Sequence, residues 1–215
     1  MTAGPLRRIG VFGGAFDPPH RAHVDLARAA IAQLQLDELR IVPTGDAWHK
    51  PRNLSAAVHR FKMAELAFSD LPQVVVDDRE LQRSGPSYTV DTLESLKSEL
   101  PGSRFFLLMG GDQFANFKSW HRWEDILQLA SICIADRAAT GASSGPAAPI
   151  GMSNPTFLPS SAATAVLRLE LGLMPISATD IRHRVAKGAS LEQLAQLVPE
   201  PVARYISLHR LYRAA

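Results

Sequence analysis

Strand-like and helix-like segments alternate from the start of this chain, and no other feature limits its choice of folds as much. Short apolar runs separate longer stretches in which apolar residues recur at helical spacing. Strands are predicted at residues 8–12, 39–42, 74–76, 105–109, 132–135 and 167–171, and the third of these is expected to be short and buried. Helices are predicted at about 20–35, from a Ser55 cap to Phe68, at about 90–100 and after Gly110-Gly111. Two or three short helices are predicted from Thr179 onward.

This alternation predicts an α/β fold: a Rossmann-like, doubly wound, mainly parallel sheet with helices on both faces. The length of 215 residues suits a single domain over 1–215, with a small C-terminal helical portion at about 179–215. Residues 138–159, rich in Ala, Gly, Ser and Pro, are predicted to form a loop. In such sheets ligands bind beyond the carboxyl ends of the strands, which is where a site is expected.

Composition excludes several classes of protein. The net charge of +2 is spread along the chain without a Lys/Arg run of the kind that marks a nucleic-acid arm, so no nucleic-acid partner is expected, and a small anionic ligand suits this charge equally well. The single cysteine, Cys133, excludes an internal disulfide and a multi-Cys zinc site, and its apolar neighbours predict burial. No stretch approaches the roughly 20 apolar residues of a membrane span, and residues 1–8 do not resemble a secretory signal. We therefore expect a cytoplasmic protein without a membrane partner, and the sequence leaves a homo-oligomer open.

The turn after the first strand carries the first candidate site: Gly13-Gly14-Ala15-Phe16-Asp17-Pro18-Pro19-His20-Arg21-Ala22-His23. Paired glycines let the backbone approach a ligand closely, and prolines suit the entrance of a helix. A helix N-terminus attracts phosphate through its N–H groups and dipole. His20 and His23, three residues apart, are expected to project to one side and to donate hydrogen bonds to a polyphosphate. The alternative is a pair of surface histidines that cap a loop.

Two further segments resemble ligand-binding positions. Ile176-Ser177-Ala178-Thr179-Asp180-Ile181-Arg182 fits a capping box of Ser177 and Asp180, and Thr179 and Arg182 add donors to that helix N-terminus. Asp112 follows a strand, where a carboxylate often accepts hydrogen bonds from ribose, although it could equally cap the next helix. Trp120 could stack on a flat ring or belong to the core.

Together these two motifs resemble the signatures of the nucleotidylyltransferase superfamily. Within it the chain resembles bacterial nicotinate-nucleotide adenylyltransferases over nearly its whole length. The segments that carry this closer resemblance are Pro43 with His49-Lys50-Pro51, His59-Arg60-Phe61-Lys62-Met63, Gly85-Pro86-Ser87-Tyr88-Thr89-Val90-Asp91-Thr92-Leu93, Gly110-x-Asp112, Trp120 and Leu211-Tyr212-Arg213.

The resemblance implies that the 5′-phosphate of nicotinate mononucleotide attacks the α-phosphorus of ATP and that pyrophosphate leaves. It implies catalytic roles for His20, His23 and Arg182, and a Mg²⁺ ion held by the phosphates rather than by protein side chains. The implied ATP-binding residues are Gly13, Gly14, Ala15, Phe16, His20, His23, Asp112, Ser177, Thr179 and Arg182; those for nicotinate mononucleotide are Lys50, Tyr88, Thr89, Trp120 and Arg137.

The chain departs from the family pattern at three places. Ala22 stands where glycine is usual, and His121 stands where tyrosine is common. Asp136-Arg137-Ala138 stands where the family usually has a basic residue and Arg-Pro-Gly. Two alternatives stay open. One is another enzyme of the superfamily, such as a phosphopantetheine adenylyltransferase or a cytidylyltransferase. The other is a catalytically silent nucleotide-binding or regulatory module.

Overall fold

A computed structural model describes residues 6–45, 54–137, 166–172 and 175–213, without the side chains of residues 136 and 137. Within them the chain forms one parallel sheet in the order β3-β2-β1-β4-β5-β6. Its strands are β1 (Arg8–Gly14), β2 (Glu38–Pro43), β3 (Val74–Val76), β4 (Arg104–Gly110), β5 (Ala130–Arg137) and β6 (Val166–Leu171). The predicted doubly wound, parallel architecture is confirmed.

The central strand β4 and the edge strand β3 differ in burial. Residues 105–109 of β4 form a continuous apolar run and all five are buried, as expected for a central parallel strand covered on both faces. The prediction of a buried strand at 74–76 is wrong in one respect. β3 lies at the sheet edge, where Val75 keeps 38% of its surface exposed.

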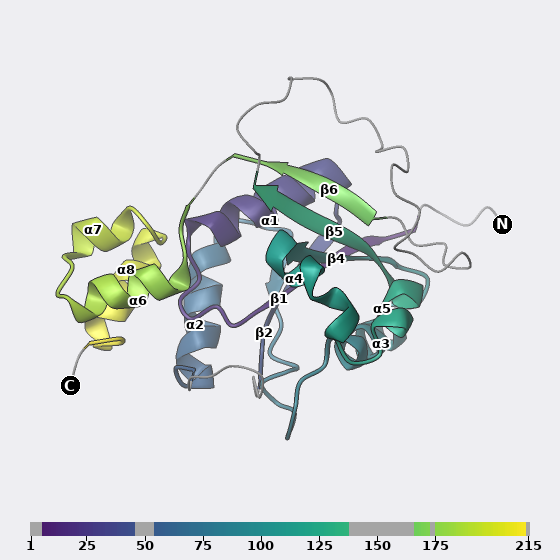
Figure 1. Ribbon diagram of the computed structural model, residues 1–215, viewed down its shortest axis with the longest axis horizontal. Helices are drawn as coiled ribbons and strands as arrows, with labels where there is room; N and C mark the ends of the chain where they lie inside the picture. Colours follow the sequence, from purple (N-terminus) through teal and green to yellow (C-terminus); the bar gives the residue numbers. More distant parts are fainter. Residues whose placement is uncertain (1–5, 46–53, 138–165, 173–174, 214–215) are drawn as a thin grey trace.

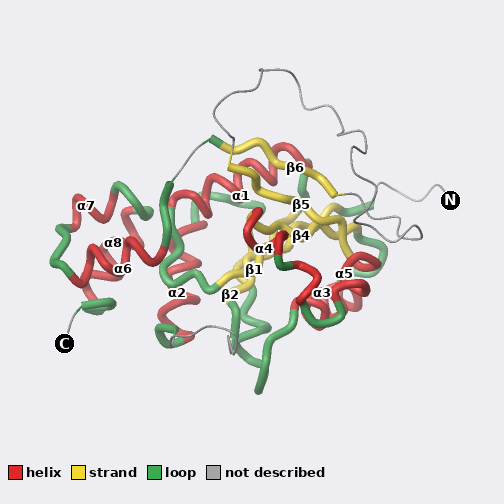
Figure 2. Tube along the Cα trace, viewed as in Figure 1, coloured by secondary structure: helices red, strands yellow, loops and turns green. Residues whose placement is uncertain are grey.

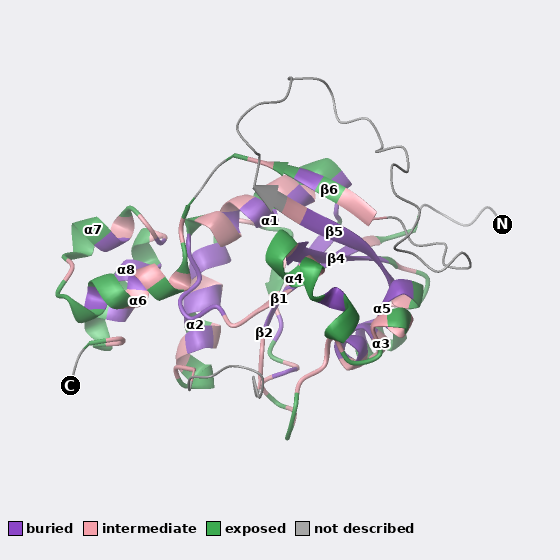
Figure 3. Cartoon of the chain, viewed as in Figure 1, coloured by how far each residue is buried: buried purple, intermediate pink, exposed green. Residues whose placement is uncertain are grey.

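Helices cover both faces of the sheet (Figures 1 and 2). On one face, α1 (Arg21–Leu34) and α2 (Ala57–Phe68) share a core with α6 (Ala178–Ala186), α7 (Leu191–Ala195) and α8 (Glu200–Leu208). On the other, α3 (Thr89–Glu99), η1 (Phe117–Ser119) and α5 (Trp123–Leu129) enclose a second core, while α4 (Gly111–Ala115) follows β4 directly. Figure 3 shows buried residues concentrated in the sheet and the helix surfaces that face it.

Two predicted helix caps need correction. Ala56 rather than Ser55 is the N-cap of α2, and the Ser55 N–H instead donates to Asp17 Oδ2 at 3.1 Å. At α6, Ser177 Oγ accepts from the Asp180 N–H at 3.1 Å, but the Asp180 carboxylate accepts from Arg184 Nε. Only one half of the predicted capping box therefore forms.

The C-terminal helices are tied to the start of α1. The Arg21 N–H donates to the Leu197 carbonyl at 3.0 Å, and Arg21 Nη2 donates to the Ala195 carbonyl at 2.7 Å. The backbone bond to Leu197 occupies one of the N–H groups that the α1 N-terminus is expected to offer to a phosphate. In the described part of the chain no helix is long and apolar enough to cross a membrane, and the predicted loop at 138–159 lies outside it.

Candidate active site

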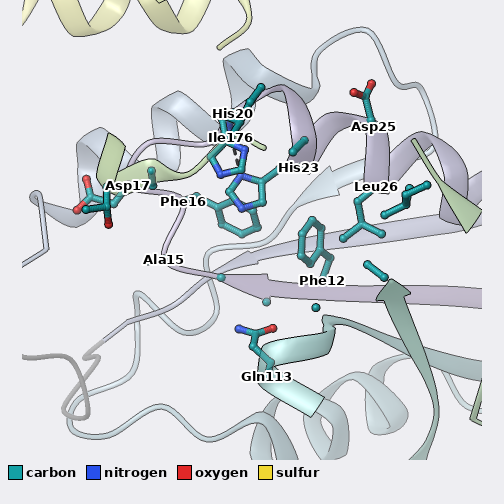
Figure 4. Close-up of a pocket in the computed structure, with 18 of the residues that line it drawn as sticks. Phe12, Ala15, Phe16, Asp17, His20, His23, Asp25, Leu26, Gln113 and Ile176 are labelled. Atoms are coloured by element: carbon teal, nitrogen blue, oxygen red, sulfur yellow. Dashed lines mark hydrogen bonds between the residues drawn. The ribbon is translucent and has the colours of Figure 1, made fainter. Parts of the chain in front are cut away.

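A cavity of about 750 Å³ opens where β1 and β4 end and strand order reverses (Figure 4). The β1–α1 turn forms one wall, the start of α6 a second, and α4 a third. Gln113 of α4 lies across the cavity from the two histidines. We call this space cavity 1; its described lining residues are Phe12, Gly13, Gly14, Ala15, Phe16, Asp17, His20, Ala22, His23, Asp25, Leu26, Gly110, Gln113, Ala135, Leu171, Gly172, Ile176, Ala178, Thr179 and Arg182.

His20 and His23 lie on the same side, as their spacing predicts, and their rings stack. Their ring centroids lie 3.7 Å apart with an interplanar angle of 20°. The His20 N–H donates to His23 Nδ1 at 3.1 Å. Because Nδ1 of His23 accepts, the proton of the neutral ring must sit on Nε2, which makes that nitrogen a donor. His23 therefore accepts the turn's hydrogen bond through Nδ1 and still offers a donor at Nε2.

His20 is the more buried of the two histidines, with 7% of its surface exposed. Burial lowers the pKa of His20 to about 4, so its ring is neutral near pH 7 before a ligand arrives. Its Nδ1 is buried and has no hydrogen-bond partner among the described residues. A buried polar atom without a partner is costly in a folded protein, and a ligand in cavity 1 could supply one.

Arg182 reaches cavity 1 from α6 and links two of its walls. Nη1 donates to the Asp17 carbonyl at 2.7 Å, and Nη2 donates to Thr179 Oγ1 at 2.9 Å. The guanidinium is thereby held beside the His20 turn, although 165 residues separate it from Asp17 in sequence. Such a fixed, permanently charged group suits recognition of phosphate.

One buried side chain for which the sequence predicts no role, that of Arg60, supports the β1–α1 turn. The Arg60 guanidinium, on a residue only 3% exposed, donates to the carbonyls of Ala15 at 3.1 Å, Thr44 at 2.7 Å and Ser55 at 3.0 Å. These bonds tie the ends of β1 and β2 to the start of α2. Arg60 belongs to one of the segments that carry the family resemblance, but its three carbonyl partners come together only in the folded chain.

A second cavity of about 450 Å³, called cavity 2, lies on the other side of the same turn. The segments at residues 87–89 and 119–121 form its walls, and Trp120 is half-buried there. Four of the described residues line both cavities: Gly13, Gly14, Ala15 and Gln113. Two ligands, one in each cavity, would therefore meet at the end of β1.

The predicted site residues divide between these spaces. Tyr88, Thr89 and Trp120 line cavity 2 together, as expected for one substrate, and Asp112 lies with them rather than in cavity 1, where the proposed ATP contacts gather. Ser177 caps α6 and is not among the residues that line either cavity. Lys50 and the side chain of Arg137 lie outside the described residues, although the Arg137 backbone pairs with Leu171.

Two adjoining cavities at the switch point of a parallel sheet, one beside stacked histidines and an arginine, define a nucleotide-binding α/β protein. The model of the cytidylyltransferase-like family matches residues 11–184. A relative from Albidiferax ferrireducens named "Probable nicotinate-nucleotide adenylyltransferase" is 54% identical over 98% of this chain and 100% of its own length. One of the same name from Bordetella petrii is 41% identical over 97% of this chain and 100% of its own. The chain belongs to the cytidylyltransferase-like family and, within it, to the nicotinate-nucleotide adenylyltransferases.

Solved structures share the fold. The nicotinic acid mononucleotide adenylyltransferase of Plasmodium falciparum, complexed with NaAD, superposes with a TM-score of 0.72 at 20% identity, covering 96% of this chain and 97% of that one. Its complex with APC gives a TM-score of 0.71 at 19% identity, with coverage of 96% and 97%.

Proposed function

We propose that this protein transfers the AMP moiety of ATP to nicotinate mononucleotide, giving nicotinate adenine dinucleotide and pyrophosphate, a step of NAD biosynthesis. The observation that carries the proposal is the meeting of cavities 1 and 2 at the Gly13–Ala15 turn. The names of relatives up to 54% identical over nearly the full chain support the choice of substrates.

In this reaction an oxygen of the acceptor 5′-phosphate forms a bond to the α-phosphorus of ATP. The bond from that phosphorus to the bridging oxygen of the β-phosphate breaks, and its electrons leave with pyrophosphate. No protein nucleophile is needed, so the protein contributes positioning and charge stabilisation.

Cavity 1 is assigned to the triphosphate. The His23 Nε2–H and the His20 ring would donate hydrogen bonds to phosphate oxygens, and Arg182 would add positive charge. The unpartnered Nδ1 of His20 supports this role because a phosphate oxygen would give it a hydrogen-bond partner. The Gly13–Phe16 backbone and Thr179 complete the proposed contacts, and Ser177 would act by capping α6.

Cavity 2 is assigned to the acceptor. Trp120 would stack on the pyridine ring, with Tyr88 and Thr89 beside it. Asp112, the expected ribose ligand, lies within this cavity, so either the acceptor ribose or an adenosine ribose near the shared wall could reach it. Phosphate contacts by Lys50 and an acceptor contact by Arg137 stay predictions.

Mg²⁺ is proposed to enter with ATP. Among the described residues no group of three or more His, Cys, Asp or Glu side chains could hold a metal ion, and the Asp17 carboxylate already accepts from Tyr212 and Ser55. We propose that the phosphates would hold this ion, which would neutralise part of their charge when bound. The cytoplasm, where ATP is abundant, remains the expected location.

Pyrophosphate release from ATP and Mg²⁺ tests the proposal, with nicotinate mononucleotide, nicotinamide mononucleotide and phosphopantetheine offered in parallel. We expect release with the pyridine mononucleotides and the appearance of a dinucleotide. Release only with phosphopantetheine would identify a different enzyme of the family. Tight ATP binding without release under any condition would identify a silent nucleotide-binding module.

A further inference from the structure

We infer that the side-chain amide of Gln113 donates a hydrogen bond to the α-phosphate of ATP, the group that is transferred, and that Gln113 is a further catalytic residue. The inference rests on the proposed function and adds to it a residue for which the sequence predicts no role. Gln113 belongs to α4, which follows β4 directly, so it lies at the edge of the sheet where the strands end.

The position of Gln113 relative to the two cavities is the first observation. Gln113 is the one residue with a polar side chain among the described residues that line both cavities. The other three, Gly13, Gly14 and Ala15, offer only backbone polar groups. With ATP in cavity 1 and the acceptor in cavity 2, the α-phosphorus and the attacking 5′-phosphate meet beside these four residues. A polar side chain in this place reaches the reacting atoms.

The direction of the amide and its lack of a partner are the second observation. In Figure 4 the Gln113 amide points from α4 into cavity 1, with His20 and His23 on the opposite side. The residue is exposed, and its side chain forms no hydrogen bond within the part of the chain that the structure describes. Asn116, which lines cavity 2 alone, differs because its amide already donates to the Asp112 carbonyl at 3.1 Å. The Gln113 amide is thus available to a ligand.

The distribution of charge shows what an amide contributes here. Arg182 and the stacked histidines line cavity 1 and not cavity 2. The described lining of cavity 2 includes two carboxylic acids, Glu80 and Asp112. A side-chain amide has two N–H donors and no negative charge, so it binds a phosphate oxygen without repelling the acceptor phosphate. Gln113 keeps both protons during transfer, and the bonds that form and break are those of the proposed reaction.

The test measures pyrophosphate release from ATP and Mg²⁺ with nicotinate mononucleotide for variants of Gln113. Gln113→Leu keeps the approximate size of the side chain and removes its donors. We expect kcat to fall about 10- to 100-fold, the range for a lost hydrogen bond to a charged group, with neither KM raised. Gln113→Glu brings a negative charge to the phosphates, and its kcat should fall further. Gln128→Leu, a change of an exposed glutamine on α5 outside both cavities, should behave as wild type.

Replacement of one α-phosphate oxygen of ATP by sulfur identifies the atom that the amide contacts. The two diastereomers of adenosine 5′-O-(1-thiotriphosphate) carry sulfur in place of different non-bridging oxygens, and sulfur accepts hydrogen bonds weakly. With one diastereomer, the change from wild type to Gln113→Leu should reduce kcat by the same factor as with ATP. With the other, the contact is already weakened in the wild type, so the reduction should nearly disappear.

The outcomes separate this inference from the proposed function. Absence of transfer to either mononucleotide by the wild-type protein overturns the proposed function and the role of Gln113 with it. Three results overturn the role of Gln113 and leave adenylyl transfer standing: normal turnover by Gln113→Leu, equal reductions with both diastereomers, or a raised KM for one substrate alone. Denaturant unfolding should give equal stability for Gln113→Leu and wild type, which excludes a general effect on the fold.

Discussion

The hydroxyl of Tyr212, near the C-terminal end of the chain, donates to Oδ1 of Asp17 at 2.6 Å. Asp17 is 1% exposed and belongs to the β1–α1 turn. Its other carboxylate oxygen accepts from the Ser55 N–H, and its carbonyl accepts from Arg182. One buried residue thus joins the turn, the approach to α2, α6 and the C-terminal segment.

Replacement of Tyr212 by Phe removes this hydrogen bond and leaves Asp17 with one partner fewer. We expect a loss of about 2 kcal/mol in the free energy of unfolding, as for a buried bond to a charged group, and a lower kcat because the turn that carries His20 loosens. Denaturant unfolding and steady-state kinetics measure the two effects. Tyr205→Phe is the matched control: it removes a hydroxyl bonded to His59 at 2.9 Å and should cost stability without lowering kcat.

The same bond predicts a loss of stability at alkaline pH. Burial and the neighbouring Asp17 raise the pKa of Tyr212 above its ordinary value of 10.0. A group with a raised pKa contributes stability that is complete below the unfolded pKa and is lost as pH rises above it. The wild-type free energy of unfolding should therefore decline above pH 10 more steeply than that of Tyr212→Phe. If the free energies of unfolding of the two proteins declined equally with pH, Tyr212 would not be the cause of the loss.

Replacement of His20 or His23 by Ala should lower kcat at least about 100-fold, the scale for loss of a group that stabilises charge in a transition state. Circular dichroism should show an intact fold in each variant. His183→Ala serves as the control for general effects of histidine removal. Near-normal turnover in either purified variant would remove that histidine from the proposed chemistry.

His20 should also limit stability in acid. Its pKa is lowered from 6.5 to about 4, so the unfolded chain binds a proton that the folded protein resists between these values. Stability therefore rises with pH through this window, and the penalty reaches about 3 kcal/mol at most below it. His20→Asn should flatten the curve between pH 4 and 6.5 in denaturant titrations. An unchanged slope would show that His20 gains its proton without cost in the folded state.

Replacement of Arg182 by Ala should act mainly on ATP, because its guanidinium contacts the walls of cavity 1. We expect kcat/KM for ATP to fall about 10- to 100-fold, as for loss of a charge-assisted contact to phosphate, with little change in KM for the acceptor. Arg184→Ala, which breaks an exposed pair with Asp180 on the same helix, is the control. A raised KM for the mononucleotide alone would reverse the placement.

Replacement of Trp120 by Ala should weaken both pyridine mononucleotides by about tenfold, since stacking does not depend on the ring substituent. The ratio of kcat/KM between the two acceptors should stay nearly constant at each pH. A large change in this ratio would show that the indole contributes to discrimination between the two acceptors.

Local features of this fold were predictable from sequence. The apolar run at residues 8–12 and the prolines before His20 predict the first strand and the helix after it, but β1 continues through Gly13-Gly14, which the sequence predicts as a turn. The spacing of three predicts that His20 and His23 project to one side, and the structure adds that their rings stack. The family resemblance, in turn, assigns Tyr88, Thr89 and Trp120 to one substrate, and the three residues do line one cavity.

The supports of the site could not be predicted in this way, because they depend on contacts between distant segments. Tyr212 and Asp17 are 195 residues apart, and Arg182 and Asp17 are 165 apart. Arg60 finds three carbonyl acceptors that meet only after β1, β2 and α2 have packed. The burial that lowers the pKa of His20 is likewise a property of the packed fold.

The shared wall of cavities 1 and 2 has a consequence for the end of the reaction. A dinucleotide product can occupy parts of both cavities at once. It then makes the contacts of both substrates but loses the translational freedom of only one molecule on binding. The arrangement that brings the reactants together therefore also holds the joined product firmly. Escape of the dinucleotide, rather than formation of the new phosphate bond, then becomes the natural candidate for the slow step of each turnover.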